Sequence, residues 1–315
     1  MKRSLRNYWR VKIKLKKITI VSGKGGVGKT TTTSALSLLF KEARENLILV
    51  DCDVDAPNLS IVLNCEELER KEIFSAEKAF LTEESCCIGC KTCFEKCPED
   101  AIIWDKENDR PDIQILFCEG CGVCAFSCPE NCIELRQVKT GNLIKQQSEY
   151  GFIVVTGEIK IGEGNSGKIV AEAKMWALDI AKELNPKPDI LLSDGPPGVG
   201  CPVIASLSDS DYIILLTEPN PAAIHDLERV LELAYHFTEN IGVIINKADL
   251  FPKSTNNIKN YLKKNNLVHL GDVPLDNRVA HAVAEGISII KFAPESKVVK
   301  SFRGIFQRIQ NFIKE

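Results

Sequence analysis

The crowding of its cysteines is the feature of this 315-residue chain that most restricts its fold. Ten of the 13 cysteines lie between Cys86 and Cys132, and only Cys52, Cys65 and Cys201 lie elsewhere. Disulfide-stabilised secreted proteins are usually shorter and begin with a signal peptide, whereas the first residues here are basic and polar. No segment approaches the roughly 20 apolar residues of a membrane span. We therefore expect a cytoplasmic protein whose clustered thiols bind metal.

Within the crowded segment, one spacing occurs twice. Cys87-x₂-Cys90-x₂-Cys93-x₃-Cys97-Pro98 is repeated as Cys118-x₂-Cys121-x₂-Cys124-x₃-Cys128-Pro129. This is the spacing of a bacterial two-cluster ferredoxin, in which the fourth cysteine of each run binds the other [4Fe–4S] cluster. Zinc would require only Cys-x₂-Cys pairs. The expected ligands are Cys87, Cys90, Cys93 and Cys128 for cluster 1, and Cys118, Cys121, Cys124 and Cys97 for cluster 2.

Two cysteines of the segment fall outside these sets. Cys132 occupies, in the second run, the place that Ala101 occupies in the first, which favours a small buried residue. Cys86 directly precedes the first run, and we interpret it as a spare thiol.

A second motif, a glycine-rich loop, lies near the start of the chain. An apolar strand at residues 18–21 leads into Gly23-x₄-Gly28-Lys29-Thr30, and a helical segment follows. In such a P-loop, backbone N–H groups and the helix N-terminus surround phosphate, the lysine reaches the β- and γ-phosphates, and the threonine hydroxyl binds Mg²⁺. The expected ATP-binding residues are Gly23, Gly25, Gly26, Val27, Gly28, Lys29, Thr30 and Thr31.

The remaining chain alternates apolar strands with helices. Strands are predicted at 47–50, 190–192, 212–216, 241–245 and 268–270, and helices near 168–184, 222–239 and 254–265. Uninterrupted apolar strands separated by helices indicate an α/β fold with a parallel sheet. We expect a basic N-terminal arm at 1–17, a discontinuous P-loop NTPase domain at 18–64 and 151–315, and an inserted small α+β ferredoxin domain at 65–150.

Lys24 gives the glycine loop a special form. The sequence Lys-Gly-Gly-Val-Gly-Lys-Thr resembles the deviant P-loop of the MinD/ParA/Mrp/nitrogenase-iron-protein group of ATPases. The resemblance implies a dimer in which Lys24 reaches the nucleotide of the partner subunit. It also implies slow, partner-stimulated ATP hydrolysis.

The same resemblance assigns roles further along the chain. Asp53 matches the carboxylate that orients the attacking water, and Asp51 lies near the Mg²⁺ shell. Asp194, in Asp194-Gly-Pro-Pro-Gly198, matches the residue that contacts Mg²⁺ through water. Asn246 and Pro274 resemble the two walls of the adenine pocket.

The two motifs together resemble the MinD superfamily P-loop ATPases with an inserted ferredoxin domain, over residues 18 to about 315. Three functions follow from the resemblance. The first is ATP-gated electron transfer to a redox partner by a homodimer or a heterodimer with a related ATPase. The second is assembly or insertion of an iron–sulfur or other metallocofactor, as in Mrp-type relatives. The third is positioning, as in MinD, which has no need of redox centres.

Cys201 allows two interpretations. In the nitrogenase iron protein, a cysteine at the same offset from the Asp194 position binds a cluster that bridges the subunits. That protein has a second such cysteine, for which this chain shows no clear counterpart outside the insert. The simpler alternative is a small buried residue.

The basic segment at the start of the chain and the amphipathic segment near its end each allow two interpretations. Residues 1–17 carry eight Lys or Arg and no acidic residue. Because the net charge of the whole chain is −3, residues 18–315 have a net charge of −11. The arm is either a solvated tail or a contact for nucleic acid or lipid, and the acidic body argues against a nucleic-acid partner. The amphipathic segment at 298–313 either packs on the core or binds a membrane surface, and we expect core packing without stable membrane anchoring.

Overall fold

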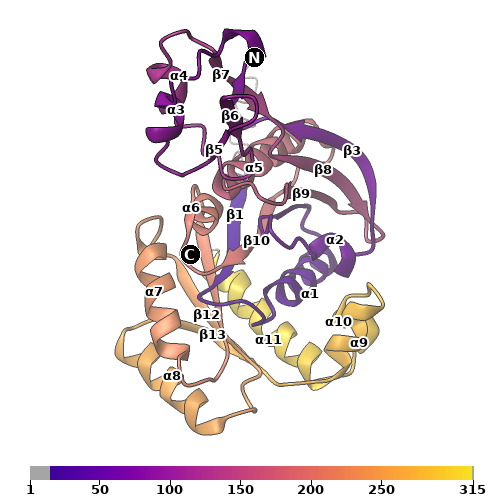
Figure 1. Cartoon of the computed structure of the whole chain (residues 1–315). Helices are drawn as coiled ribbons and strands as arrows, with labels where there is room; N and C mark the ends of the chain where they lie inside the picture. Colours follow the sequence, from indigo (N-terminus) through magenta and orange to yellow (C-terminus); the bar gives the residue numbers. More distant parts are fainter. Residues whose placement is uncertain (1–14, 314–315) are drawn as a thin grey trace, which may run out of the picture.

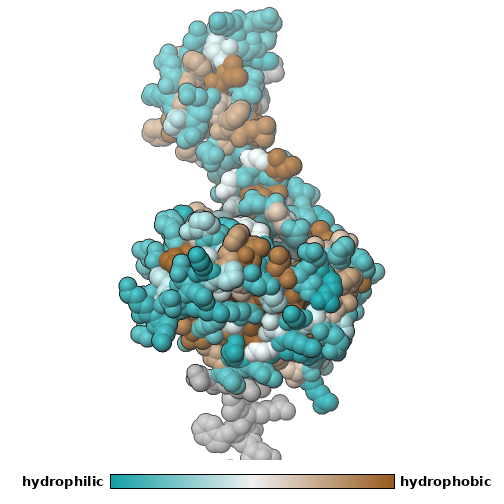
Figure 2. All heavy atoms as spheres, turned by 90° about the horizontal axis from the view of Figure 1, so that it is seen from below, coloured by the Kyte–Doolittle hydropathy of each residue, from teal (hydrophilic) through white to brown (hydrophobic). Residues whose placement is uncertain are grey.

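The computed structural model describes residues 15–313, which form a large α/β domain and a small lobe (Figure 1). In Figure 2 the lobe stands away from the large domain and is joined to it through a narrower waist. The expected basic arm lies mainly outside the described residues. Its last two residues, Lys16 and Lys17, begin the first strand.

The large domain is built on a nine-stranded sheet in the order β13-β12-β11-β1-β10-β2-β9-β8-β3. The first seven strands of this order are parallel, and β8 and β3 are antiparallel to their neighbours. The parallel strands are β1 (Lys16–Ser22), β2 (Leu47–Asp51), β9 (Ile153–Ile159), β10 (Ile190–Pro197), β11 (Tyr212–Thr217), β12 (Ile241–Asn246) and β13 (Val268–Val273). All six strands predicted for this domain are confirmed.

Helices cover both faces of the sheet, as continuous apolar strands require. One face packs against α1 (Lys29–Glu42), α2 (Leu59–Val62), α9 (Arg278–Ala284), α10 (Ile289–Phe292) and α11 (Lys297–Phe312). The other packs against α5 (Ser166–Glu183), α6 (Cys201–Leu207), α7 (Ala223–Tyr235) and α8 (Pro252–Lys264). The apolar face of α11 is buried through Phe302, Ile305 and Ile309. Its amphipathic pattern thus reflects core packing, and no helix among residues 15–313 is long and apolar enough to span a membrane.

The expected insert of residues 65–150 contains two parts. Its two ends form β3 (Cys65–Ile73) and β8 (Gly141–Ser148), which extend the large sheet by an antiparallel pair. Only residues 76–138 form the separate lobe. At the waist, buried Thr140 ties the two connecting segments together: its N–H donates to Ile73 O at 2.8 Å, and its hydroxyl lies 2.7 Å from Ser75 Oγ.

The lobe has an internally duplicated architecture. Strand β4 (Ala76–Leu81) pairs with β7 (Ile133–Val138), and β5 (Ile102–Asp105) pairs with β6 (Arg110–Ile113). Between these pairs lie the 3₁₀ turn η1 (Glu84–Cys86) and the short helices α3 (Thr92–Glu95) and α4 (Val123–Ser127). Its small core is made of Ala79, Cys93, Ala101, Ile102, Cys118, Cys124 and Ile133. Cysteine side chains are therefore part of the packing of this lobe.

A buried ion pair joins the lobe to the large domain. Lys78 on β4 lies 3.2 Å from Glu163, which belongs to the segment between β9 and α5, and the two side chains are only 6% and 5% exposed. Lys78 Nζ also donates to Ile115 O at 3.0 Å. On the same side, Lys168 near the start of α5 donates to Ser75 O.

Candidate functional site

The carboxyl ends of β1, β10 and β2 bring the predicted nucleotide residues together. These strands are neighbours in the sheet, although β10 begins 139 residues after the end of β2 and 168 residues after the end of β1. Asp51, the last residue of β2, and Asp194 on β10 are register partners. The glycine loop joins β1 to α1 at the same edge, where ligands of open parallel sheets bind.

Gly28 closes the loop in a conformation that other residues adopt only with strain. Its φ is 93°, and a Cβ there would lie 2.5 Å from Asn246 Nδ2. Asn246 Nδ2 in turn donates to Val27 O at 2.7 Å. In this structure Asn246 therefore braces the glycine loop.

Lys29, the first residue of α1, lies within reach of the charges of three carboxylates. Its side chain is buried, and burial lowers the pKa of its ammonium, while the charges of Asp194, Asp53 and Asp51 act in the opposite direction. The structure thus brings together the lysine and the three acidic residues that the sequence predicted. This arrangement places one cation and several anions at the end of the loop.

Asp51 and Asp194 form a buried acidic pair. Burial raises the pKa of Asp194 to about 6, against hydrogen bonds from Thr30 and Thr33 and the charge of Lys29. The Thr33 hydroxyl donates to Asp194 Oδ1 at 2.9 Å. Burial, followed by the charge of Asp194, also raises the pKa of Asp51, which accepts bonds from the Leu59 and Asp53 N–H groups. Two buried carboxylates beside the Thr30 hydroxyl suit a hard divalent cation such as Mg²⁺.

Asp53 lies on the loop that follows β2. Burial raises the pKa of its carboxyl, while the charge of Lys29 lowers it. Asp53 therefore sits close to the end of the phosphate loop, but it is less enclosed than Asp51.

Lys24 is paired within its own chain. Its ammonium lies 2.7 Å from one oxygen of Glu218, and Lys247 lies 2.8 Å from the other. Lys247 also donates to Gly26 O at 3.2 Å, so Glu218 and Lys247 hold the loop from the side. Sequence reasoning did not assign these two charges a role. Glu218 and Lys247 directly follow β11 and β12, and this position at the ends of parallel strands could have marked them as residues of the site.

The two predicted walls of the adenine pocket are adjacent. Asn246 pairs in register with Val273, the residue before Pro274. Asp249 accepts a hydrogen bond from the Leu275 N–H at 2.7 Å, which ties the two loops together.

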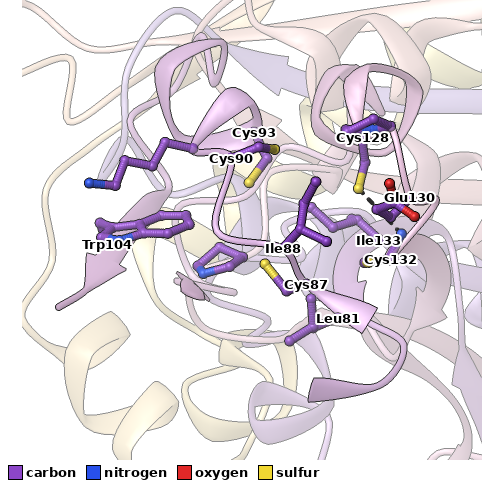
Figure 3. Close-up of a pocket in the computed structure, with 13 residues that line it drawn as sticks. Leu81, Cys87, Ile88, Cys90, Cys93, Trp104, Cys128, Glu130, Cys132 and Ile133 are labelled. Atoms are coloured by element: carbon purple, nitrogen blue, oxygen red, sulfur yellow. Dashed lines mark hydrogen bonds between the residues drawn. The ribbon is translucent and has the colours of Figure 1, made fainter. Parts of the chain in front are cut away.

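Four cysteines from both runs line each of two pockets in the lobe. The first contains Cys87, Cys90, Cys93 and Cys128 of the runs, and Cys132 also lines it (Figure 3). The second contains Cys97, Cys118, Cys121 and Cys124. Each pocket thus takes three cysteines from one run and one from the other, and the groups match the two sets predicted from the spacing. Among the described residues, no group of three or more His, Cys, Asp or Glu side chains is arranged to hold a single metal ion.

The surroundings of the sulfurs repeat between the two pockets. Ala101 N–H donates to Cys97 Sγ at 3.3 Å, and Cys132 N–H donates to Cys128 Sγ at the same distance. Burial raises the pKa of Cys93 to about 11, and the nearby Cys87, Cys90 and Cys128 thiols add to the rise. Converging thiols with N–H donors are the environment of a bound iron–sulfur cluster, whose positive iron would stabilise the thiolates.

Cys86 and Cys132 form a disulfide, with their Cα atoms 5.5 Å apart. The interpretation of Cys86 as a spare thiol is therefore wrong. The turn η1 places Cys86 against Cys132, which lies four residues after the last cysteine of the second run. Cys132 is buried, as expected. The two cysteines are 46 positions apart, and the sequence between them gave no signal of this proximity.

Cys201 is the first residue of α6, and its side chain is exposed. The interpretation of Cys201 as a small buried residue is therefore wrong. A Cβ at Gly167, on the first turn of α5, would lie 3.1–3.2 Å from the backbone and Cβ of Cys201, so the two helix starts touch.

Comparison with known proteins agrees with the nucleotide site. The CbiA family, described as the CobQ/CobB/MinD/ParA nucleotide-binding domain, matches residues 18–289. An uncharacterised protein of Methanocaldococcus jannaschii is 34% identical over 297 residues, which cover 94% of this chain and 97% of the relative. The septum site-determining protein MinD of Thermotoga maritima is 24% identical, with 93% of this chain and 87% of the relative covered.

Solved structures support the same fold. MinD of Pyrococcus horikoshii, complexed with Mg-ADP, superposes with a TM-score of 0.57 at 20% identity, covering 95% of this chain and 98% of that one. MinD of Aquifex aeolicus gives a TM-score of 0.55 at 16% identity, with 94% and 97% covered. On the family match over residues 18–289, the chain belongs to the CobQ/CobB/MinD/ParA family of nucleotide-binding proteins.

Proposed function

We propose that this protein is a cytoplasmic ATPase that couples nucleotide-driven motion to electron transfer through two [4Fe–4S] clusters. The observation that carries the proposal is that each pocket is lined by three cysteines of one run and by the last cysteine of the other run. Each pocket takes its fourth cysteine from the other run, which is how two-cluster ferredoxins bind their clusters. Clusters bound there supply one-electron transfer.

The nucleotide site supports in-line hydrolysis of ATP. Lys29 and the loop N–H groups bind the phosphates, and Thr30, Asp51 and Asp194 would hold the Mg²⁺ that neutralises phosphate charge. Asp53 orients the attacking water near the loop. Lys24 leaves Glu218 when a second subunit, identical or related, presents its nucleotide.

A continuous set of contacts supports the coupling. Asp194 lies on β10, and α6 begins shortly after that strand ends. The start of α6 touches Gly167 on α5, and the segment before α5 holds Glu163 against Lys78 in the lobe. Lys78 also holds Ile115 O, three residues before the cluster 2 ligand Cys118. Movement near Asp194 can therefore reach the lobe through packed groups.

Anaerobic purification with iron and sulfide analysis tests the clusters, and EPR spectroscopy of the reduced protein tests the coupling. We expect about eight iron atoms per chain, and spectra that change on adding ATP and Mg²⁺. The Lys29→Ala variant, which keeps all cysteines, is the matched control and should show the spectra without the change. If the protein contains about eight iron atoms per chain but neither its EPR spectra nor its reduction of a partner changes with ATP, the coupling is overturned. If the protein contains no iron, the proposal of bound clusters is overturned.

A metallocofactor assembly or insertion role is the second candidate. The observation that favours it is the exposed Cys201, which lies close to the nucleotide edge at the start of α6. The test is ATP-dependent transfer of iron to an apo-ferredoxin, with Cys201→Ser compared with wild type. Transfer that is independent of both ATP and Cys201 would exclude this role.

A positioning role like that of MinD receives less support. It gives the two cysteine pockets no role. The apolar face of α11 is packed on the sheet and is therefore not free to bind a membrane surface. We propose no nucleic-acid partner.

A further inference from the structure

We propose that the Cys86–Cys132 pair is a redox-active disulfide that receives two electrons from the cluster 1 site and reduces a disulfide of a partner protein. This inference rests on the proposed function for the arrival of electrons. It adds a two-electron exit, and a substrate class, to a lobe whose other cysteines bind one-electron carriers.

The position of the pair carries the first step. Cys132 lines the same pocket as Cys87, Cys90, Cys93 and Cys128 (Figure 3). Its N–H donates to the Cys128 sulfur at 3.3 Å, and Cys86 directly precedes Cys87 in the chain. Both sulfurs of the disulfide therefore belong to residues adjoining cluster 1 ligands.

The duplication of the lobe shows that packing does not require a cysteine here. Ala101 occupies the equivalent position beside the other pocket, is only 1% exposed, and makes the same N–H···S contact at 3.3 Å. A small apolar residue thus satisfies this place in the fold. The disulfide is confined to the half of the lobe that holds cluster 1.

The two sulfurs differ in access. Cys132 is 2% exposed, whereas Cys86 is partly exposed at the surface turn η1. Cys86 Sγ lies 3.6 Å from Glu130 O, which can accept a hydrogen bond from the thiol formed on reduction. An accessible attacking thiol and a shielded resolving thiol are the two parts that thiol–disulfide exchange needs.

The proposed reaction is balanced as follows. A one-electron donor of low potential supplies two electrons, one at a time, and with two protons the disulfide becomes two thiols. The Cys86 thiolate attacks a disulfide of the partner, and one partner sulfur leaves and is protonated. The Cys132 thiolate then attacks Cys86, which restores the internal disulfide and releases the second partner thiol.

Alkylation and mass spectrometry test the electron transfer. Anaerobic protein of measured iron content is oxidised with oxidised glutathione, reduced with dithionite, and alkylated at timed intervals. We expect both Cys86 and Cys132 to become alkylated in wild type, and at least about tenfold more slowly in Cys90→Ser, which lacks a cluster 1 ligand.

The outcomes separate the two proposals. A disulfide that persists while EPR shows reduced clusters, or that opens equally fast in Cys90→Ser, overturns this inference alone. Iron far below about eight atoms per wild-type chain overturns the proposed function, and the electron route with it.

Trapping tests the exit. Reduced Cys132→Ser should form a mixed disulfide with insulin through Cys86, while Cys86→Ser should not. Cys132→Ala, which copies Ala101, is the control and should retain the iron content of wild type. Equal trapping by Cys86→Ser would overturn the assignment of Cys86 as the attacking thiol.

Discussion

The nucleotide edge and the cysteine lobe are assembled in different ways. At the nucleotide edge, the buried carboxylates Asp51 and Asp194 lie on strands of a nine-stranded sheet with large cores on both faces, and Lys29 begins α1. In the lobe, two-stranded ribbons enclose a core in which cysteines are among the main members. The first site is shaped by the packing of a large sheet, whereas cysteine side chains make up much of the small core around the second.

Replacing Lys29 is the strongest way to separate the two regions. Lys29→Ala removes the buried cation beside three carboxylates, so ATP hydrolysis should fall by about 10²- to 10³-fold. Iron content should be unchanged, because no cluster cysteine lies near the loop. Phosphate release and iron analysis of the same sample provide the measurement. Lys182→Ala, on an exposed face of α5, is the control, and equal loss in that variant would contradict the assignment.

Removing the clusters should affect the lobe alone. Treatment with a chelator and an oxidant removes the proposed clusters, whose predicted ligands Cys93, Cys118 and Cys124 belong to the core of the lobe. Limited proteolysis should then cut within residues 76–138, at least about tenfold faster than in the loaded protein, while the sheet stays intact. Equal protection of the lobe before and after removal would show that its packing is self-sufficient.

The buried ion pair between Lys78 and Glu163 should set how firmly the two regions are joined. Lys78→Met leaves Glu163 buried without its counter-charge, which is expected to cost about 3–5 kcal/mol. The response of the EPR spectra to ATP should be lost, while hydrolysis and iron content remain.

The double variant Lys78→Met/Glu163→Met is the control for this effect. It should recover most of the stability, measured by thermal unfolding, because no charge is left buried. Coupling that survives in both variants would show that motion reaches the lobe by another route.

The smallest expected effect is a pH dependence at the nucleotide edge. The pKa of Asp194 rises from 3.8 to about 6 on folding, so between these values the folded protein holds a proton that the unfolded chain releases. Raising the pH through this window should therefore lower the free energy of unfolding, and the raised pKa of Asp51 should extend this loss to higher pH. Urea unfolding at pH 4 and pH 7, compared with Asp194→Asn, measures the difference. An identical pH dependence in the variant would exclude Asp194 as its cause.

The large domain was predictable where its segments are buried. Strands such as β10 and β11 are continuous apolar runs, and the glycine loop has a fixed spacing, so local sequence determines both. Strand β3 was not predictable, since Cys65–Ile73 is charged along most of its length and largely exposed. It is a strand because it pairs with β8, and pairing is not encoded by periodicity.

The candidate sites show the same division. The grouping of the run cysteines in two pockets agrees with the spacing, because a two-cluster ferredoxin fixes how far apart such cysteines lie along the chain. The contacts of Glu218 with Lys24 and of Cys86 with Cys132 join segments that meet only after folding. Such pairs leave no local pattern, and they are where prediction from the sequence ended.

The pairing of β3 with β8 has a consequence for how such a chain arises and can be rebuilt. Ile73 and Gly141 are register partners, so the two points where the chain leaves and re-enters the sheet lie side by side. Any segment whose ends meet can occupy that gap without disturbing the strands beneath it. Replacing residues 75–139 with a short turn should close β3 and β8 into an ordinary hairpin and leave a freestanding nucleotide-binding domain. The same opening would accept a different small domain in place of the present lobe.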